Sequence, residues 1–379
     1  MGAMPDVAIV GGGIIGCAIA YQLAKAGAAV TIIERGALAR EASWASAGLI
    51  PPPKPGLPGG MARARLEARS FALYPALLAE LAEATDVDMA HVTSGRLSVA
   101  LSEAEETSLR ETLVWQRDLG FDVAWLAGDA TRRMAPALAP TIRGAVWCAA
   151  ASGVRAAALT LALARAAEAR GATIREGTPV EGFLREGSGV VGVRTPGGAI
   201  RAGATVIAAG AWTAAVGELL DLELPTRPVR GQMLALADAA PSLRHAIAGA
   251  GGFLIPRADG TIAVAATVDE AGFDTRITPD GLTWLATLIR TLAPGYAGAR
   301  VVETWAGLRP ATADDLPLMG RAPGLDGLWV AAGHMRDGIL WALVVGEVMA
   351  AAILGGEPDP ALALFDPGRF GSWVVRREA

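Results

Sequence analysis

The feature that most constrains the fold is a glycine-rich turn between a short β-branched run and a helical pattern, near the start of the chain. The run Val7–Val10 is apolar and ends at Gly11-Gly-Gly-Ile-Ile-Gly16. A helical pattern continues to about Gly27, and a second apolar run, Val30–Ile33, ends at Glu34. Strand, glycines, helix, strand and terminal acid in this order predict the first unit of a doubly wound parallel sheet.

Each glycine of the Gly11-x-Gly13-x-x-Gly16 pattern, and the acid after it, has a physical task in binding a dinucleotide. Gly11 makes the tight turn, Gly13 lets the backbone approach a pyrophosphate, and Gly16 lets helix and strand pack closely. The phosphates would lie at the N-terminus of the helix, where backbone N–H groups are unpaired. Glu34 ends the second strand, where a carboxylate can accept hydrogen bonds from ribose hydroxyls. The alternative, a glycine-rich turn between ordinary elements, does not account for the whole pattern.

Composition narrows the class of protein. The 379 residues suffice for two or three domains, and 52% hydrophobic with 19% charged residues favour a large core over disorder. A net charge of -5 argues against a nucleic-acid partner. Two cysteines, Cys17 and Cys148, cannot form a disulfide framework, which predicts a cytoplasmic protein. Residues 339–354 are apolar but short and contain Glu347, so we expect a buried helix and no transmembrane segment.

The run behind the first glycine turn carries a family resemblance. The sequence Arg40-Glu-Ala-Ser-Trp-Ala-Ser-Ala-Gly-Leu49 resembles the glycine oxidase (ThiO) branch of the D-amino acid oxidase-like flavoproteins. The resemblance implies that the nucleotide is FAD rather than NAD, and that this run lies between the FAD pyrophosphate and the flavin. An NAD-dependent dehydrogenase would leave the small side chains of this run unexplained.

The resemblance also implies a set of residues around a non-covalently bound FAD. Cys17 and Cys148 lie outside the C-terminal region where some relatives tether the flavin. The helix that follows the second glycine turn would stabilise negative charge on the flavin. The implied cofactor-binding residues are Gly11, Gly13, Ile14, Ile15, Gly16, Glu34, Arg35, Ala42, Ser43, Ala47, Gly48, Leu49, Val180, Gly210, Gly333, His334, Met335, Arg336, Asp337, Gly338, Ile339 and Leu340.

Two arginines are candidates for holding the substrate. A guanidinium grips a carboxylate with two parallel hydrogen bonds. In the family, the arginine of Gly-Leu-Arg-Pro, here Arg309, binds the substrate carboxylate, and the arginine of Gly-His-x-Arg-x-Gly, here Arg336, contacts substrate or cofactor. The alternatives are an ion pair of Arg309 with Asp314 or Asp315, and pairing of Arg336 with Asp337 or with backbone.

The substrate wall departs from the family pattern. Phe253 stands where tyrosine is frequent in the family, Val268 where methionine is frequent, and Gly251 near a position where the family has histidine. A less polar pocket could favour a larger or secondary amine, although Phe253 could equally be a core residue. The proline-rich stretch Pro51–Gly60 is a loop that could cover the site or serve as a connector.

No metal site is expected. The three histidines, His91, His245 and His334, share no motif with cysteines or acids at metal-ligand spacing. His334 is expected to contribute backbone near the flavin rather than acid–base chemistry.

The predicted architecture is α/β (α+β overall), with a Rossmann-like FAD-binding domain and an antiparallel-sheet substrate domain. The FAD-binding domain is predicted at residues 1–85, 146–223 and 305–379, and the substrate domain at residues 86–145 and 224–304.

The predicted function is oxidative deamination of a small amino acid or N-substituted glycine. The α-carbon would give a hydride to flavin N5, the imine would hydrolyse, and O2 would reoxidise the flavin to give H2O2. A glycine oxidase would supply a thiamine precursor. One alternative is a D-amino acid or proline-type dehydrogenase that passes electrons to a quinone or other carrier, and another is a nucleotide-binding module without redox catalysis. The substrate, its chirality and the electron acceptor stay open, and a homo-oligomer is compatible with the sequence.

Overall fold

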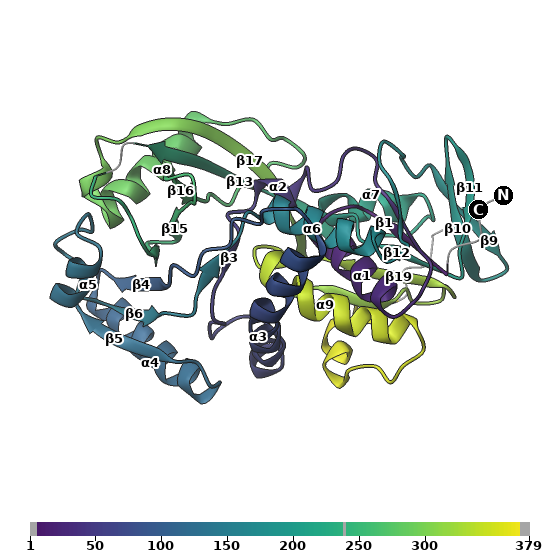
Figure 1. Ribbon diagram of the computed structural model, residues 1–379, viewed down its shortest axis with the longest axis horizontal. Helices are drawn as coiled ribbons and strands as arrows, with labels where there is room; N and C mark the ends of the chain where they lie inside the picture. Colours follow the sequence, from purple (N-terminus) through teal and green to yellow (C-terminus); the bar gives the residue numbers. More distant parts are fainter. Residues whose placement is uncertain (1–5, 238–239, 372–379) are drawn as a thin grey trace.

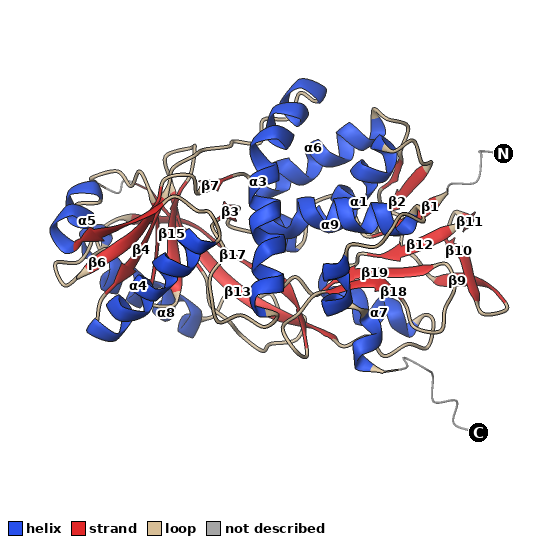
Figure 2. Ribbon diagram, turned by 90° about the horizontal axis from the view of Figure 1, so that it is seen from below, coloured by secondary structure: helices blue, strands red, loops and turns tan. Residues whose placement is uncertain are grey.

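The computed structural model describes residues 6–237 and 240–371. Two large sheets organise the chain, one mainly parallel with six strands and one mainly antiparallel with eight (Figure 1). Figure 2 shows the helices α1, α3, α6 and α9 gathered on one side of the six-stranded sheet. The predicted combination of a Rossmann-like sheet with a second sheet is therefore confirmed.

The six-stranded sheet has the predicted first strand near its centre. Its order is β18 (Leu318–Arg321), β19 (Leu328–Ala332), β12 (Ala204–Ile207), β1 (Val7–Val10), β2 (Val30–Ile33) and β8 (Thr173–Arg175). All neighbours are parallel except β18, which pairs antiparallel with β19 at one edge. The strands predicted at 7–10 and 30–33 are confirmed. The sequence predicts a loop through Leu316–Gly320, but residues 318–321 form the edge strand because they pair with β19.

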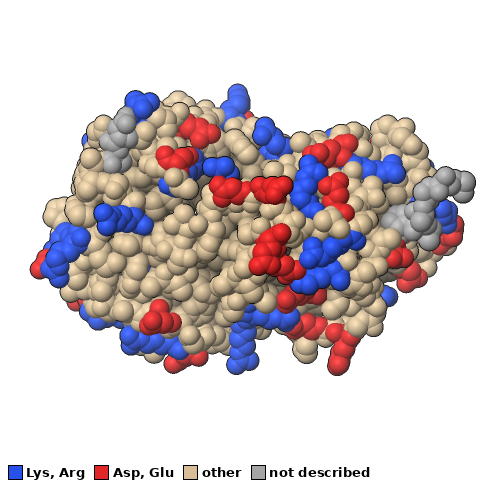
Figure 3. All heavy atoms as spheres, in the orientation of Figure 1, with Lys and Arg blue, Asp and Glu red and all other residues tan. Residues whose placement is uncertain are grey.

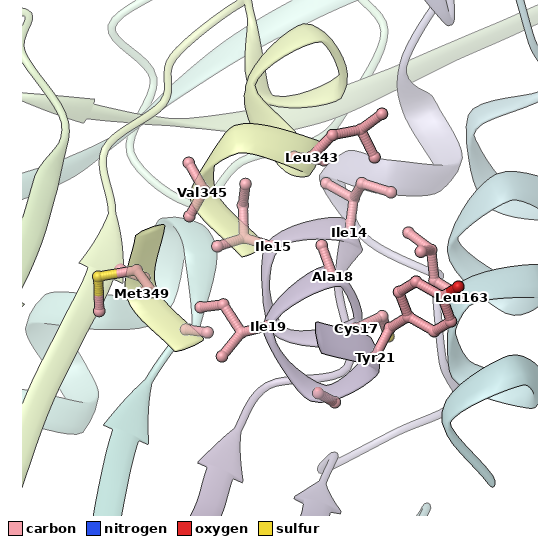
Figure 4. Packing of buried hydrophobic residues seen from close by; sticks show 14 of the residues in the cluster. Ile14, Ile15, Cys17, Ala18, Ile19, Tyr21, Leu163, Leu343, Val345 and Met349 are labelled. Carbon is pink, nitrogen blue, oxygen red and sulfur yellow. The ribbon is translucent and has the colours of Figure 1, made fainter. Parts of the chain in front are cut away.

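Helix α1 (Ile14–Lys25) is buried on nearly all sides between two other helices, α6 (Ala156–Glu168) and α9 (Gly338–Ile353). Figure 4 shows Ile15 and Ile19 of α1 facing Val345 and Met349 of α9. Helix α9 is apolar around most of its circumference, which fits its burial, and its one acidic residue, Glu347, pairs with Arg69 at 2.8 Å. No helix in the described part of the chain has the length and apolar character that a bilayer crossing would require.

Two glycines permit the close approaches of α1. A Cβ on Gly16 would lie 2.1 Å from the carbonyl oxygen of Gly11, and a Cβ on Gly346 of α9 would lie 2.8 Å from the carbonyl oxygen of Ala18. Both contacts are with backbone, which cannot rotate away. The helix and the turn before it can therefore take their positions only if these side chains are absent.

The eight-stranded sheet combines segments from both predicted inserts. Its order is β17 (Arg300–Thr312), β13 (Thr226–Ala237), β16 (Ile262–Ala265), β15 (Gly252–Pro256), β14 (Ala246–Gly249), β4 (Arg96–Ala100), β6 (Gly144–Cys148) and β5 (Val123–Ala127). The sheet is not wholly antiparallel as expected, because β14 and β4 pair in parallel. This pair joins the two inserts, whose strands come from distant parts of the chain and are not connected by a hairpin.

The strand β17 is longer than the sequence indicates. The sequence predicts a strand over Arg300–Trp305 and places Arg309 in extended backbone at a strand end, but pairing with β13 continues to Thr312. Arg309 therefore lies within a paired strand, opposite Val229, rather than at a strand end. The indole N–H of Trp305 donates to the carbonyl of Ala45 at 3.1 Å and connects this strand to residues 40–49.

Three helices cover the eight-stranded sheet, namely α4 (Glu103–Asp118), α5 (Gly128–Met134) and α8 (Pro279–Leu292). The predicted capping box of Ser102 and Glu105 is present at the start of α4. The apolar spacing in α8 predicts a buried face of Leu282, Leu285, Ile289 and Leu292. This face needs one correction, because Leu282 is 37% exposed whereas Leu288 is 3% exposed. The buried stripe begins instead at Gly281, which packs on Gln232.

The remaining elements connect these layers. They are α2 (Ala42–Ala45), β3 (Leu49–Ile50), α3 (Gly60–Ala84), β7 (Ser152–Gly153), β9 (Gly182–Glu186), β10 (Gly189–Thr195), β11 (Gly198–Arg201), α7 (Thr213–Glu218), and the 3-10 helices η1 (Gly210–Trp212), η2 (Pro294–Tyr296), η3 (Pro360–Phe365) and η4 (Pro367–Phe370). The hydroxyls of Ser70 and Tyr74 on α3 donate to the carbonyls of Leu340 and Ile339, which fixes the first turn of α9.

The division into two domains stays a prediction. Strand β6 runs to Cys148, past the expected boundary at 146, and β17 crosses the expected boundary at 305. Residues 1–5 and 372–379, which belong to the predicted FAD-binding ranges, lie outside the described residues. On the face seen in Figure 3, blue and red side chains are interspersed, without a large area of one sign.

Replacing Gly346 by alanine is expected to destabilise the protein. Alanine favours a helix over glycine by about 1 kcal/mol, but the new Cβ would overlap the Ala18 carbonyl, and overpacking costs about 1–3 kcal/mol. Urea unfolding should therefore show a net loss of stability for Gly346→Ala. The control Gly298→Ala adds a Cβ in open space and should change stability by less than about 0.5 kcal/mol. A stabilised Gly346→Ala variant would contradict the close helix contact.

Candidate active site

A cavity of about 520 Å³ lies where the two sheets meet. Its walls come from the ends of β1 and β2, the α2 segment, the turn before α9, and the inner face of β13, β15 and β17. The cavity thus lies at the carboxyl ends of the parallel strands, the place where doubly wound sheets bind ligands.

The nucleotide end of the cavity is formed by the first glycine turn. Gly11 has φ +118°, and a Cβ there would lie 2.4 Å from the carbonyl oxygen of Ala208. The backbone N–H of Ile14, in the first turn of α1, donates to the hydroxyl of Ser43 at 2.9 Å. The Ser43 contact brings residues 40–49 against the N-terminus of α1.

Glu34 is held at the edge of the same turn. One carboxylate oxygen accepts the N–H of Gly12 at 2.7 Å, and the other accepts the N–H of Gly36 at 2.9 Å. The carboxylate is therefore oriented by backbone at the end of β2. Both of its oxygens retain lone pairs that a ribose hydroxyl can use.

The far side of the nucleotide end contains an aromatic ring that the sequence analysis did not single out. The guanidinium of Arg35 lies over the Trp212 ring, 4.0 Å from its centroid. Both residues line the cavity, together with the predicted Val180 and Gly210. Trp212 lies two residues after the predicted Gly210, so proximity to that residue was the available signal.

The opposite end of the cavity is formed by residues 334–338, which lead into α9. His334 is 4% exposed, and its Nε2 has no hydrogen-bond partner within the described residues. Burial, and secondarily the charge of Arg63, lower its pKa to about 3. His334 is therefore neutral at physiological pH. The N–H of Met335 donates to the carbonyl of Pro310 at 2.8 Å, which joins this turn to β17.

The charge of Asp337, in the same turn, is balanced by Arg63 of α3. Its carboxylate accepts a hydrogen bond from Arg63 at 2.9 Å. Arg63 also pairs with Glu67 at 2.7 Å, and Glu67 accepts from the indole of Trp341 at 3.1 Å. This buried network holds the turn against α3. It also means that Asp337 is not paired with Arg336, contrary to one alternative raised above.

Arg309 reaches into the cavity from β17. Its Nη1 donates to the carbonyl of Thr267 at 2.9 Å, and its guanidinium lies where a Cβ on Gly231 would be. Burial first, and then the charge of Arg336, lower its pKa to about 10, so it remains protonated at neutral pH. Over residues 6–237 and 240–371 it forms no ion pair. The expected alternative partner Asp314 pairs instead with Arg369 at 2.8 Å.

The carboxylate that acts most directly on Arg309 is occupied elsewhere. Asp269 opposes the lowering of the Arg309 pKa. Its Oδ2, however, accepts hydrogen bonds from Arg230 at 3.0 Å, from Gln232 at 2.8 Å and from Thr267 at 2.9 Å. The network leaves the guanidinium fork of Arg309 available to an external carboxylate.

Most predicted site residues meet around this cavity. Phe253, Arg309 and Arg336 line it, as do Gly11, Gly13, Ile14, Ile15, Glu34, Arg35, Ala42, Ser43, Ala47, Gly48, Leu49, Val180, Gly210, His334, Met335, Asp337, Gly338 and Ile339. Their roles in binding stay predictions.

Four predicted residues lie outside the cavity lining. Val268 is 49% exposed, Leu340 is in the buried face of α9, and Gly16 supports α1 packing. Gly333 makes the turn at φ +81°, where a Cβ would meet Thr312 at 2.3 Å. In this segment the cavity is lined by Ala265 and Ala266 instead of Val268.

The cavity also contains residues that the sequence analysis did not name as site residues. Met233 and Ala266 belong to its apolar wall, and Lys54 comes from the proline-rich loop. An isolated lysine among prolines was the signal for Lys54. In the described ranges, no group of three or more His, Cys, Asp or Glu residues could hold a metal ion.

Comparison with known proteins gives consistent matches over nearly the whole chain. The family model described as "FAD dependent oxidoreductase" (DAO) matches residues 6–352. Glycine oxidase of Pseudomonas aeruginosa is 36% identical over 358 residues, covering 94% of this chain and 97% of the relative. Glycine oxidase of Geobacillus kaustophilus is 36% identical over 368 residues, covering 95% and 96%. The crystal structure of the latter enzyme matches with a TM-score of 0.90 over 96% of this chain and 98% of that one.

His334 should make stability depend on pH. The unfolded histidine binds a proton below about pH 6.5, whereas the folded one does so only near pH 3, so stability falls as the pH drops below about 6.5. Between pH 7 and pH 5 this contributes a loss of about 2 kcal/mol. Urea unfolding of His334→Asn should show a correspondingly smaller loss than the original protein over this range. Equal losses would mean that His334 protonates readily in the folded state.

Proposed function

This chain belongs to the FAD-dependent oxidoreductase (DAO) family, and we propose that it catalyses oxidative deamination of a small amino acid or N-substituted glycine. The predictions of an FAD cofactor and of an oxidoreductase acting on amino acid CH–NH donors are confirmed by the family match and the glycine oxidase relatives. The observation that carries the proposal is Arg309, a cavity-lining guanidinium without a carboxylate partner among the described residues.

The shape and chemistry of the cavity fit FAD. A Cβ on Gly11 would clash with the carbonyl of Ala208, so only glycine allows this tight turn. The turn presents bare backbone at the N-terminus of α1. Ser43 and Glu34 supply a hydroxyl and an oriented carboxylate at the nucleotide end. The unpartnered Nε2 of His334 and the first turn of α9 lie at the other end. When bound, FAD supplies the capacity to take two electrons from a carbon–nitrogen bond. We propose that it is held without a covalent link.

The protein's own contribution is to position the substrate. Arg309 binds the carboxylate bidentately, and Arg336 adds positive charge from the neighbouring turn. Because Met335 is hydrogen-bonded to Pro310, the two arginines are held on adjacent segments. Phe253, Met233 and Ile255 form an apolar wall that excludes water from the reacting carbon.

The neutral state of His334 suits this role. A cationic imidazole beside Arg309 and Arg336 would add a third positive charge, but burial keeps the ring uncharged at neutral pH. His334 therefore contributes shape and a hydrogen-bonding nitrogen rather than charge.

The finer features of the proposal are the substrate range and the acceptor. Relatives are named glycine oxidases, and glycine is accordingly one expected substrate. Phe253 brings no hydroxyl to the wall, which favours secondary or larger amines. We propose O2 as the acceptor, with imine hydrolysis and H2O2 formation after substrate oxidation.

Anaerobic mixing with glycine, sarcosine, D-alanine and D-proline tests the proposal. At least one should bleach the yellow flavin, and air should then restore the colour with one H2O2 formed per substrate oxidised. Bleaching that is reversed by a quinone or dye but not by air would instead identify a dehydrogenase. A protein that binds FAD but is bleached by no amine would contradict redox catalysis and favour a nucleotide-binding module.

Replacing Arg309 by leucine should weaken substrate binding far more than FAD binding. Loss of a charge-assisted bidentate contact costs about 3 kcal/mol, or roughly 150-fold in KM. Arg309→Lys keeps the charge without the fork and should fall in between. In the control Arg201→Leu, an exposed arginine of β11 that pairs with Glu186 is removed, and KM should be unchanged. An unaltered KM in Arg309→Leu, with normal FAD content, would show that Arg309 does not hold the carboxylate.

A further inference from the structure

Lys54 is one of two lysines in the chain, and it lies in the wall of the cavity. It belongs to the loop between β3 and α3 (Figure 1), and within this loop Pro51 also lines the cavity. The function proposed above gives this lysine no task, because Arg309 already supplies a site for the substrate's α-carboxylate.

The loop that carries Lys54 is anchored on both sides. The buried amide of Gln116, on α4, donates to the carbonyl of Pro53 at 2.6 Å. Prolines at 51, 52, 53 and 55 restrict the backbone around Lys54. At the end of the loop, Gly59 has φ +88° and packs beside Leu316 and Leu364. The backbone position of Lys54 is therefore set by contacts with both sheet regions before any ligand arrives.

The ammonium of Lys54 makes no hydrogen bond or ion pair with any residue that the structure describes. The Lys54 side chain is exposed at the cavity wall. Partial desolvation by the surrounding wall nevertheless lowers its pKa, against the effect of Asp337, and the positive charges of Arg336, Arg96 and Arg63 lower it further. Asp337 is the one carboxylate acting in the opposite direction in this set, and it is already paired with Arg63. Lys54 therefore stands in an environment with an excess of positive charge.

A second cation, Arg96, contributes to this excess. Arg96 begins β4 on the other sheet, and among the described residues it too makes no hydrogen bond or ion pair. Burial lowers its pKa to about 10, while Cys148 and Asp337 act weakly in the opposite direction. Arg96 does not line the cavity itself, but its positive charge acts on Lys54, which does. An anion bound at Lys54 would therefore also be favoured by the charge of Arg96.

The other acidic residues of the cavity do not neutralise these charges. Glu34 is hydrogen-bonded to Gly12 and Gly36 at the nucleotide end, and Glu41 pairs with Arg35 at 2.9 Å. One substrate carboxylate on Arg309 would still leave Lys54 and Arg96 without a counterion. A substrate with one acid group thus matches only part of the positive charge on this side of the cavity.

We propose that Lys54, assisted by the charge of Arg96, binds a second carboxylate, so that the preferred substrate is an amino acid or N-substituted glycine carrying two acid groups. The proposal rests on the function proposed above and specifies its substrate class. The second carboxylate could be attached through the amine nitrogen or through the α-carbon, and both attachments present the same group to Lys54.

Pairs of substrates that differ in one charge test the proposal. Iminodiacetate and its mono-amide, N-(carbamoylmethyl)glycine, have nearly the same shape, as do aspartate and asparagine in each enantiomeric form. For the attachment that fits, kcat/KM for the diacid should exceed that for the amide by about tenfold or more. A ratio near one for both pairs would overturn the proposal.

Substitution of Lys54 assigns the discrimination to this residue. Lys54→Gln should reduce the diacid-to-amide ratio by about tenfold, mainly through the KM of the diacid, and Lys54→Arg should largely retain the ratio. The matched control Lys25→Gln changes the other lysine, which pairs with Glu80 at 2.8 Å, and should leave the ratio unaltered. An unchanged ratio in Lys54→Gln would show that Lys54 does not bind the second acid group.

Binding of unreactive acids separates this proposal from the proposed oxidation. Malonate and succinate should perturb the flavin absorption of the FAD-loaded protein at lower concentrations than acetate and propionate do, and Lys54→Gln should remove that difference. If the diacids bind in this way but no amine bleaches the flavin, the second anion site stands and the oxidase proposal fails. If amide substrates bleach the flavin without any preference for diacids, the oxidase proposal stands and the second anion site is overturned.

Discussion

Backbone approaching backbone at α1 is the constraint on which the rest of the structure depends. The turn at Gly11 lies against Ala208, Gly16 lies against Gly11, and Gly346 lies against Ala18, each at distances that a Cβ would make impossible. These contacts bury α1 between α6 and α9 and aim its N-terminus at the cavity. The position of the nucleotide end thus follows from where side chains are missing rather than from any specific polar contact.

The charged groups of the cavity differ in whether they have a partner within the protein. Acidic groups near the site are engaged by protein partners: Asp337 by Arg63, Asp269 by Arg230 and Gln232, and Glu41 by Arg35. Arg309 and Lys54, by contrast, have no acidic partner within the described part of the chain. Satisfying the acids internally while leaving cations free makes the cavity selective for anionic ligands before any of them binds.

The parts of this molecule that sequence reasoning could predict are those with a local cause. The glycine turn, the strands β1 and β2, the capping box at Ser102 and the buried helix α9 each follow from residues close together in the chain. The parallel pairing of β14 with β4 and the extension of β17 could not be predicted, because both depend on partners more than 70 residues away. For the site, the motif residues met around one cavity, whereas Val268 did not, and Trp212 and Lys54 belong to no motif. Motifs locate backbone that a ligand must approach closely, but side chains contributed by loops and sheet faces depend on the tertiary arrangement.

The continuity of β17 has a consequence for how sequences of this kind can vary in length. Arg309 faces the cavity because β17 is in register with β13, and a shift of one residue would turn it to the opposite face. The register irregularity between Ala235 and Leu236 is confined to the distal end of the pair. Insertions and deletions can therefore accumulate at that end, in the residues that precede Glu303. The seven residues from Glu303 to Arg309 must keep their number, because a change would alter the face on which Arg309 lies.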